Sequence, residues 1–279
     1  MSFQPLVPLS GIAGLRFIER TQAAQLEVFN KSPQIEREIQ YFKENISGAL
    51  SAESLTDDFL LRKVALGAFG LDDDLPKKFF INKILSEGTD DREAFANRLV
   101  DGRYRELAET FGYGNALGAN VVQSDFADKI ISAYQTQKFE RAVGDVDNSI
   151  RLAMNFKREI SDYTSAEKAT DTAWFQVMGN TPLRTVFEKA FNLPSSVGAL
   201  DIERQLDIFK EKSQKILGSD SLTALTDPEK VEGLIRDFMI RDQLAGGSRA
   251  PVAGSAALSI LQNSSLGSIG TANLLLSNI

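Results

Sequence analysis

Helical periodicity runs through almost the whole chain, over residues 11–244, and this constrains the fold more than any other feature of the sequence. Apolar residues recur at steps of four, three and four, as in Ile35, Ile39, Phe42 and Ile46, which places them on one face of a helix. No segment shows the regular alternation of apolar and polar residues that is typical of a β-strand. We therefore predict an all-α, multi-helical protein.

Start and stop signals divide this periodic region into separate helices. The pair Ser32-Pro33 interrupts or caps the first helix, and Gly88 ends a later one. Asp90 is an N-cap candidate, and Glu93, three residues later, completes the pattern of a capping box. The sequence thus predicts that the next helix begins near Asp90 and continues to Phe111.

The second half of the chain repeats the order of the first. Residues 61–71 align with residues 183–193 without a gap, and six of the eleven positions are identical. Further matches lie upstream, where Arg37, Phe42, Lys43 and Ile46 align with Arg151, Phe156, Lys157 and Ile160. Because the matching segments occur in the same order in both halves, we favour a tandem duplication of one helical unit. The apolar faces of the two copies are then expected to pack together about a pseudo-twofold axis.

Three regions follow from this repeat and from a change in composition. Residues 1–115 form the first helical repeat with an N-terminal arm, residues 116–245 form the second, and residues 246–279 form a Gly/Ser/Leu-rich C-terminal tail. A long helix from about residue 122 to residue 143 is expected to pack across both halves. The tail is predicted to be flexible, because glycine and serine disfavour a helix.

The C-terminal tail is too apolar for an ordinary disordered segment, so we expect it to bind a protein surface. Two interpretations remain open: the tail binds a protein partner or another copy of the chain, or it folds back on its own core. Its candidate partner-binding residues are Leu258, Leu261, Leu266, Ile269, Leu274, Leu275 and Ile279.

Charge and composition exclude several classes of function. The formal charge is −7, which disfavours nucleic acid as a partner. The sequence contains no cysteine and no histidine, which removes thiolate chemistry and every catalytic triad that needs an imidazole base. No run approaches the roughly 20 apolar residues of a membrane span, and the N-terminus does not resemble a signal peptide. We expect no membrane insertion, and a location either in the cytoplasm or outside it after export without a cleaved signal peptide.

Four short motifs with possible chemistry have simpler structural explanations. Residues 112–118 are glycine-rich but follow a helical pattern rather than a strand, which favours a loop over a phosphate site. Residues 145–149 begin like a calcium loop but lack its later glycine and glutamate. The acidic run 72–74 and Ser165 both suit helix N-termini. We predict no catalytic residue, cofactor, metal ion or small-molecule ligand, and therefore no enzyme.

Several runs are similar to an uncharacterised bacterial family. Residues 17–21, 32–42, 65–71 and 97–104 resemble an alphaproteobacterial domain-of-unknown-function family, number 1217, whose genes are often found among flagellar genes. The resemblance covers roughly residues 1–245 and implies a flagellum-associated role, without supplying any catalytic residue.

These observations lead to a functional hypothesis with two alternatives. The chain is expected to be a non-enzymatic structural or assembly protein that acts through protein-protein contacts or self-association, including the apolar tail and the N-terminal arm, residues 3–9. The first alternative is a cytoplasmic export chaperone or regulator of flagellar assembly, which holds a helix of another protein. The second is an enzyme that uses carboxylates or a metal ion.

Overall fold

The computed structural model describes residues 4–165 and 171–245, and these residues form helices, turns and loops without any β-strand. The prediction of an all-α protein is confirmed. The chain divides into two compact units, Met1–Asp242 and Gln243–Ile279, and the second is described only as far as residue 245. The predicted division at residues 115 and 116 is not a boundary between these units, and it stays a prediction.

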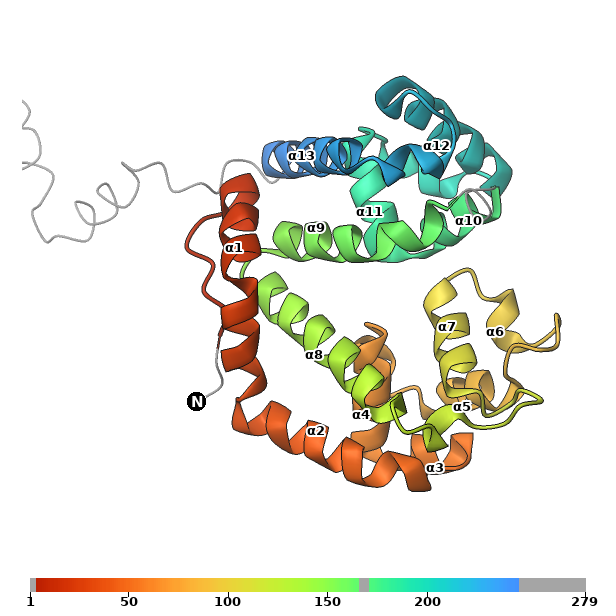
Figure 1. The fold of residues 1–279 in the computed structure, drawn as a ribbon. Coiled ribbons are helices and arrows are strands. Elements are labelled where there is room, and N and C mark those ends of the chain that lie inside the picture. Colours follow the sequence, from red (N-terminus) through yellow and green to blue (C-terminus); the bar gives the residue numbers. More distant parts are fainter. Residues whose placement is uncertain (1–3, 166–170, 246–279) are drawn as a thin grey trace, which may run out of the picture. The chain divides into compact units, whose positions relative to one another are not determined.

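The described residues contain thirteen α-helices (Figure 1). In the first half these are α1 (Gly11–Asn30), α2 (Pro33–Asn45), α3 (Ala52–Asp57), α4 (Phe59–Ala68), α5 (Lys78–Glu87), α6 (Phe95–Arg98) and α7 (Gly102–Phe111). In the second half they are α8 (Phe126–Gly144), α9 (Asn148–Glu159), α10 (Asp171–Gly179), α11 (Thr181–Ala190), α12 (Ile202–Leu217) and α13 (Pro228–Ala245). None of the described helices is long and apolar enough to cross a membrane.

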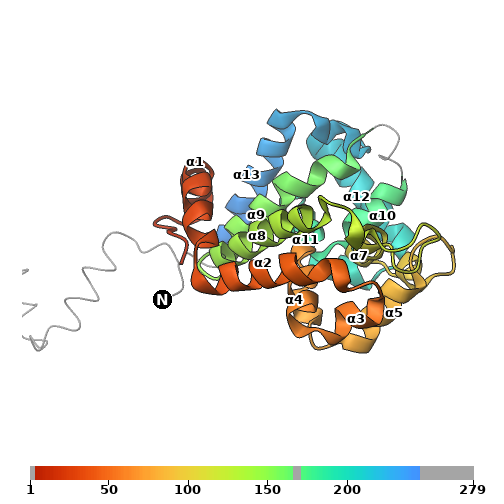
Figure 2. The same ribbon diagram turned by 60° about the horizontal axis from the view of Figure 1, so that its bottom comes forward.

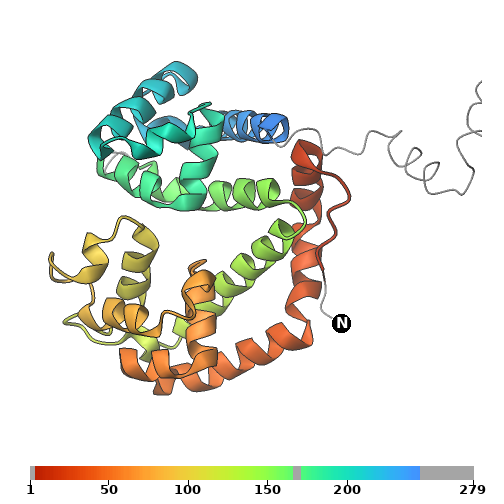
Figure 3. The same cartoon turned by 180° about the vertical axis from the view of Figure 1, so that it is seen from behind.

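Helix α8 is the central packing element of the first unit. It contacts α1, α2 and α4 of the first half and α9 of the second, as Figure 2 shows for α2 and Figure 3 for α1. Its buried side chains lie all around the helix, which is typical of a helix surrounded by others. The expectation of a helix near residues 122–143 that packs across both halves is confirmed, with a start at Phe126.

In a pseudo-twofold arrangement, a contact between one helix of each half recurs between the two corresponding helices, and the contacts between these halves follow this pattern. Helix α1 packs against α9, and α2 packs against α8, while α1 and α8 also contact each other. If α1 corresponds to α8 and α2 to α9, the first two contacts are equivalent. Such an exchange is consistent with the predicted duplication, which stays a prediction.

The two segments aligned in the sequence also end in the same way. After α4, the Leu71 amide donates to the Leu66 carbonyl at 2.9 Å, and after α11 the Leu193 amide donates to the Glu188 carbonyl at 2.8 Å. Between them, Gly70 and Asn192 have φ values of 65° and 53°. These are the bonds and the left-handed residue of a Schellman-type helix end.

The prediction that a helix begins near Asp90 and continues to Phe111 is wrong. Residues 88–94 form turns instead, α6 spans only Phe95–Arg98, and α7 begins at Gly102. The Asp90 carboxylate accepts from the Ala116 amide at 2.7 Å, so it holds a distant loop rather than a helix start. Asp101 caps α7 by accepting from the Arg103 amide at 3.1 Å. Polar side chains that bond elsewhere in a loop compete with helix formation in this way.

Candidate functional site

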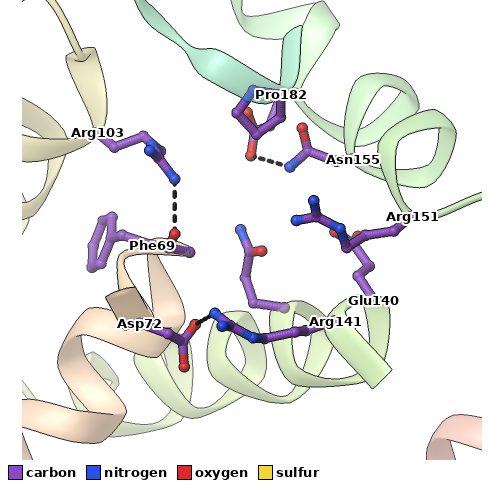
Figure 4. A pocket seen from close by; sticks show the side chains of 11 residues that line it. Phe69, Asp72, Arg103, Glu140, Arg141, Arg151, Asn155 and Pro182 are labelled. Carbon is purple, nitrogen blue, oxygen red and sulfur yellow. Dashed lines mark hydrogen bonds and ion pairs between the residues drawn. The ribbon is translucent and has the colours of Figure 1, made fainter. Parts of the chain in front are cut away.

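A polar cavity lies inside the first unit, where the end of α4, the start of α7, the helices α8 and α9 and the start of α11 meet. Three arginines line it, Arg103, Arg141 and Arg151. This pocket has a volume of about 30 Å³, and a neighbouring pocket of about 380 Å³ is lined by the same three arginines. Figure 4 shows their guanidinium groups approaching one space from three sides. We call this space the arginine cavity.

Arg103 is held firmly at the start of α7. Its Nη1 donates to the Gly70 carbonyl at 2.8 Å, and its Nη2 donates to the Asp101 carboxylate at 2.6 Å. Asp101 is also the N-cap of α7, so one carboxylate fixes both the helix end and the arginine. The guanidinium therefore has a fixed position at one side of the cavity.

Arg141 and Lys138 of α8 hold the acidic turn of residues 72–74, which forms a short 3₁₀-helix. Lys138 Nζ lies 2.6 Å from Asp72 Oδ1, and Arg141 Nη2 lies 2.8 Å from Asp73 Oδ1. The sequence placed these acids at the N-terminus of a helix, but α5 starts only at Lys78. Asp72 and Asp73 instead pair with cations on α8, more than 60 residues away in the chain, while Asp74 pairs with Lys77 and accepts from the Tyr104 hydroxyl.

Arg151 of α9 differs from the other two arginines. Its Nε donates to the Asn148 side chain at 2.9 Å, and it forms no ion pair with any residue that the structure describes. Burial lowers the pKa of Arg151 below its ordinary value, and the nearby positive charge of Arg141 lowers it further. The negative charges of Glu140 and Asp73 oppose this lowering in part.

Asn155 lies one helical turn after Arg151 and also lines the cavity. Its side chain is only 7% exposed, and its Nδ2 donates to Glu159 Oε1 at 2.8 Å. The Oδ1 atom accepts no hydrogen bond from the described residues. A buried acceptor without a donor costs free energy.

Glu140 is the buried carboxylate of the cavity, and Arg158 of α9 neutralises it. The two side chains form two bonds, at 2.9 Å and 3.0 Å. Burial raises the pKa of Glu140 above its ordinary value, although the hydrogen bond from Arg158 lowers it in part. Arg158 is hydrogen-bonded to Glu140, and Arg151 interacts with Glu140 through its charge without forming an ion pair.

None of these cavity residues was predicted as a site from the sequence. Arg151 appeared there only as the match of Arg37, whose Nε donates to the exposed Pro33 carbonyl. The available signal was Asn155, a polar residue among the buried positions of α9. That signal is weak, because the other residues that line the cavity around Asn155 come from four other helices and their loops.

The N-terminal arm is the second candidate site, and it is docked along α1. Gln25 of α1, 9% exposed, accepts from the Leu6 amide at 2.7 Å and donates to the Leu6 carbonyl at 3.2 Å. A Cβ on Gly14 would lie 2.0 Å from the Leu9 carbonyl oxygen, so only glycine allows this approach. The backbone is fixed, while the side chains of Leu6 and Leu9 stay 61% and 52% exposed. Of the expected arm, residue 3 lies outside the described residues.

The predicted partner-binding residues of the tail also lie outside the described residues. These are Leu258, Leu261, Leu266, Ile269, Leu274, Leu275 and Ile279.

The fold and the cavity define an all-α protein whose polar groups meet at the junction of two helical halves. Residues 68–231, more than half of the chain, match the model of a family described as "Protein of unknown function (DUF1217)", and the chain belongs to this family. It is also similar to a protein from Agrobacterium tumefaciens solved by X-ray crystallography. The two are 30% identical, the similarity covers 87% of this chain and 99% of that one, and the TM-score is 0.70. No protein of curated function matches the chain.

Proposed function

We propose that this chain is a non-enzymatic structural or assembly protein of the flagellum that acts through protein-protein contacts. The observation that carries the proposal is the docked N-terminal arm, in which Gln25 holds the backbone while Leu6 and Leu9 face outward. Because the backbone is already fixed, little backbone entropy is lost when a partner covers these side chains. The arm therefore has the physical character of a preorganised contact surface.

The flagellar part of the proposal rests on the family resemblance in the sequence and on the neighbourhood of flagellar genes that it implies. The first alternative is a cytoplasmic export chaperone or regulator of flagellar assembly. The second alternative, an enzyme that uses carboxylates or a metal ion, has less support because the sequence has no histidine or cysteine. The location of the protein in the cell distinguishes a structural or assembly protein from an export chaperone or regulator.

The arm is tested by replacing Leu6 and Leu9 with aspartate in the full chain. Because their side chains are exposed, we expect the fold to lose less than about 1 kcal/mol. Covering two aspartates with an apolar partner surface is costly, so we expect at least a tenfold loss of affinity for the partner or for a second copy. The measurements are swimming on soft agar by a deletion strain that expresses the variant, and the sizes of cross-linked complexes.

Leu50→Asp combined with Leu117→Asp is a matched control, since both leucines are exposed and the change in charge is the same. This control should restore swimming and leave the complexes unchanged. Full restoration by the Leu6 and Leu9 variant, with unchanged complexes, would exclude the arm as a contact surface. A deletion strain that swims normally would argue against the flagellar role.

A further inference from the structure

The N-terminal arm runs along α1 in the opposite direction to that helix (Figure 3). Leu6 bonds Gln25 in the second half of α1, whereas Leu9 lies against Gly14 near the start of the helix. The arm therefore starts beside the end of α1. Gln4, the first described residue, lines a pocket at this end of the helix.

This pocket, which we call the arm pocket, has a volume of about 480 Å³ and lies between the arm, α1, α2 and α8. Its apolar lining residues are Pro5, Phe29, Ile35 and Ala142. The two cations that line it, Lys138 and Arg141, already pair with Asp72 and Asp73. A cavity of roughly 150 Å³ holds a benzene molecule, so the arm pocket has room for a phenyl ring.

The side chains of the arm alternate between exposed and buried positions. Gln4 and Leu6 are exposed, Pro5 between them is buried, and Val7 packs against the core. The proline also disfavours a helical backbone at Gln4 and favours an extended one. In an extended strand, side chains two residues apart point to the same face. The same alternation, carried one residue back, directs the Phe3 side chain to the side of Pro5, toward the arm pocket.

The lining of the arm pocket suits an aromatic side chain in particular. Phe29 is 7% exposed and packs edge-to-face against Phe139, with the ring centroids 5.7 Å apart. Aromatic rings gain edge-to-face or offset-stacked contacts in addition to the burial of apolar surface. A phenyl ring in the pocket would extend the pair of Phe29 and Phe139 into a larger aromatic cluster.

Phe3 is tethered directly to this pocket. Consecutive Cα atoms lie about 3.8 Å apart, so Phe3 is within one residue's length of Gln4. A tethered group reaches an effective concentration on the order of millimolar, which exceeds the concentration of a second copy in most solutions. The chain's own Phe3 is therefore favoured over Phe3 of another molecule.

We propose that the arm pocket binds the Phe3 side chain of the same chain and thereby anchors the start of the arm. Phe3 then faces inward and holds the backbone, while Leu6 and Leu9 of the same arm stay exposed. The anchor acts whether or not the arm contacts a partner, so this inference does not rest on the proposed function.

The test is hydrogen exchange of the Leu6 amide in the purified full chain, measured by NMR. This amide is protected while the arm is docked, because it donates to Gln25. We expect Phe3→Ala to raise its exchange rate by about tenfold or more, since the anchor no longer opposes opening of the arm. Leu9→Ala is the matched control: the Leu9 side chain is 52% exposed, so we expect a change of less than about twofold.

A pocket variant connects this effect to the arm pocket. Ala142→Glu places a charged side chain among the apolar lining residues, so in this background Phe3→Ala should raise the Leu6 exchange rate by less than about threefold. Ala127→Glu, on the same helix but outside the pocket, should leave the effect of Phe3→Ala unchanged. Circular dichroism confirms that each variant is folded.

The occupant is checked by repeating the exchange at about 50 µM and about 500 µM protein, because binding of Phe3 from a second copy would depend on concentration. Equal rates at both concentrations support the proposal. Protection of the wild type that rises with concentration would overturn it in favour of a second copy. The proposal is also overturned if Phe3→Ala changes the rate no more than Leu9→Ala does, or if its effect is as large in the Ala142→Glu background as in the wild type.

Discussion

Replacing Trp174 with alanine is expected to lower the free energy of unfolding by about 3–5 kcal/mol. Trp174 is 1% exposed, and its ring lies 5.4 Å from the Phe187 ring and 6.1 Å from the Phe209 ring. Its Nε1 donates to the Asp220 carbonyl at 2.9 Å. Alanine would leave a large cavity among these rings and an unpaired carbonyl at its edge.

The measurement is urea unfolding followed by circular dichroism, because the variant loses the only tryptophan of the chain. Trp174→Phe is the matched control: it keeps an aromatic ring and loses the Nε1–H donor, so we expect a loss of about 1–2 kcal/mol. A loss below about 1 kcal/mol for Trp174→Ala would show that this aromatic cluster does not hold the second half together.

Replacing Lys63 with methionine is expected to destabilise the first half by about 3 kcal/mol at pH 7. The Glu38 side chain is 7% exposed and pairs with Lys63, which is 20% exposed. Glu38 also accepts from the Tyr134 hydroxyl and, at 3.1 Å, from Gln34 Nε2. Methionine keeps an unbranched apolar stem as far as Cε but leaves a buried carboxylate without its cation. Lys43→Met is the control, because its ion pair with Asp128 is exposed and is expected to contribute less than about 1 kcal/mol.

This second prediction also has a pH dependence with a defined sign. Burial alone raises the pKa of Glu38, but hydrogen bonds from Lys63, Tyr134 and Gln34 together outweigh it and hold the pKa below the ordinary 4.5. The stability that ionised Glu38 contributes is therefore present above about pH 4.5 and lost as the pH falls through the lower folded-state value. The gap between the wild type and Lys63→Met should narrow when urea unfolding is repeated from pH 7 to pH 4. A constant gap would contradict the assigned role of Glu38.

Local patterns in the sequence were sufficient for much of the fold. The first helix ends beside Ser32-Pro33, and Gly88 and Gly112 terminate α5 and α7 with positive φ values, as turn chemistry predicts. Such features depend on neighbours within a few residues, so a single sequence contains the information.

The predictions that were wrong concern residues whose bonding partners are distant in the chain. Asp90 was predicted to cap a helix but accepts from the Ala116 amide, and Asp72 and Asp73 were predicted at a helix start but pair with α8. The arginine cavity is the extreme case, because its residues come from five helices and their neighbouring loops. The packing of α8 against α4 and α9, and of α11 against α9, brings residues together that are far apart in the chain.

The most direct test of the proposed function is cell fractionation of flagellated cells that express the full chain, compared with cells that lack a working flagellar export apparatus. The proposal of a structural or assembly protein predicts that the chain appears in the basal-body fraction or the culture medium only when export works. Equal retention in the cytoplasm of both strains would contradict it and favour the export chaperone or regulator.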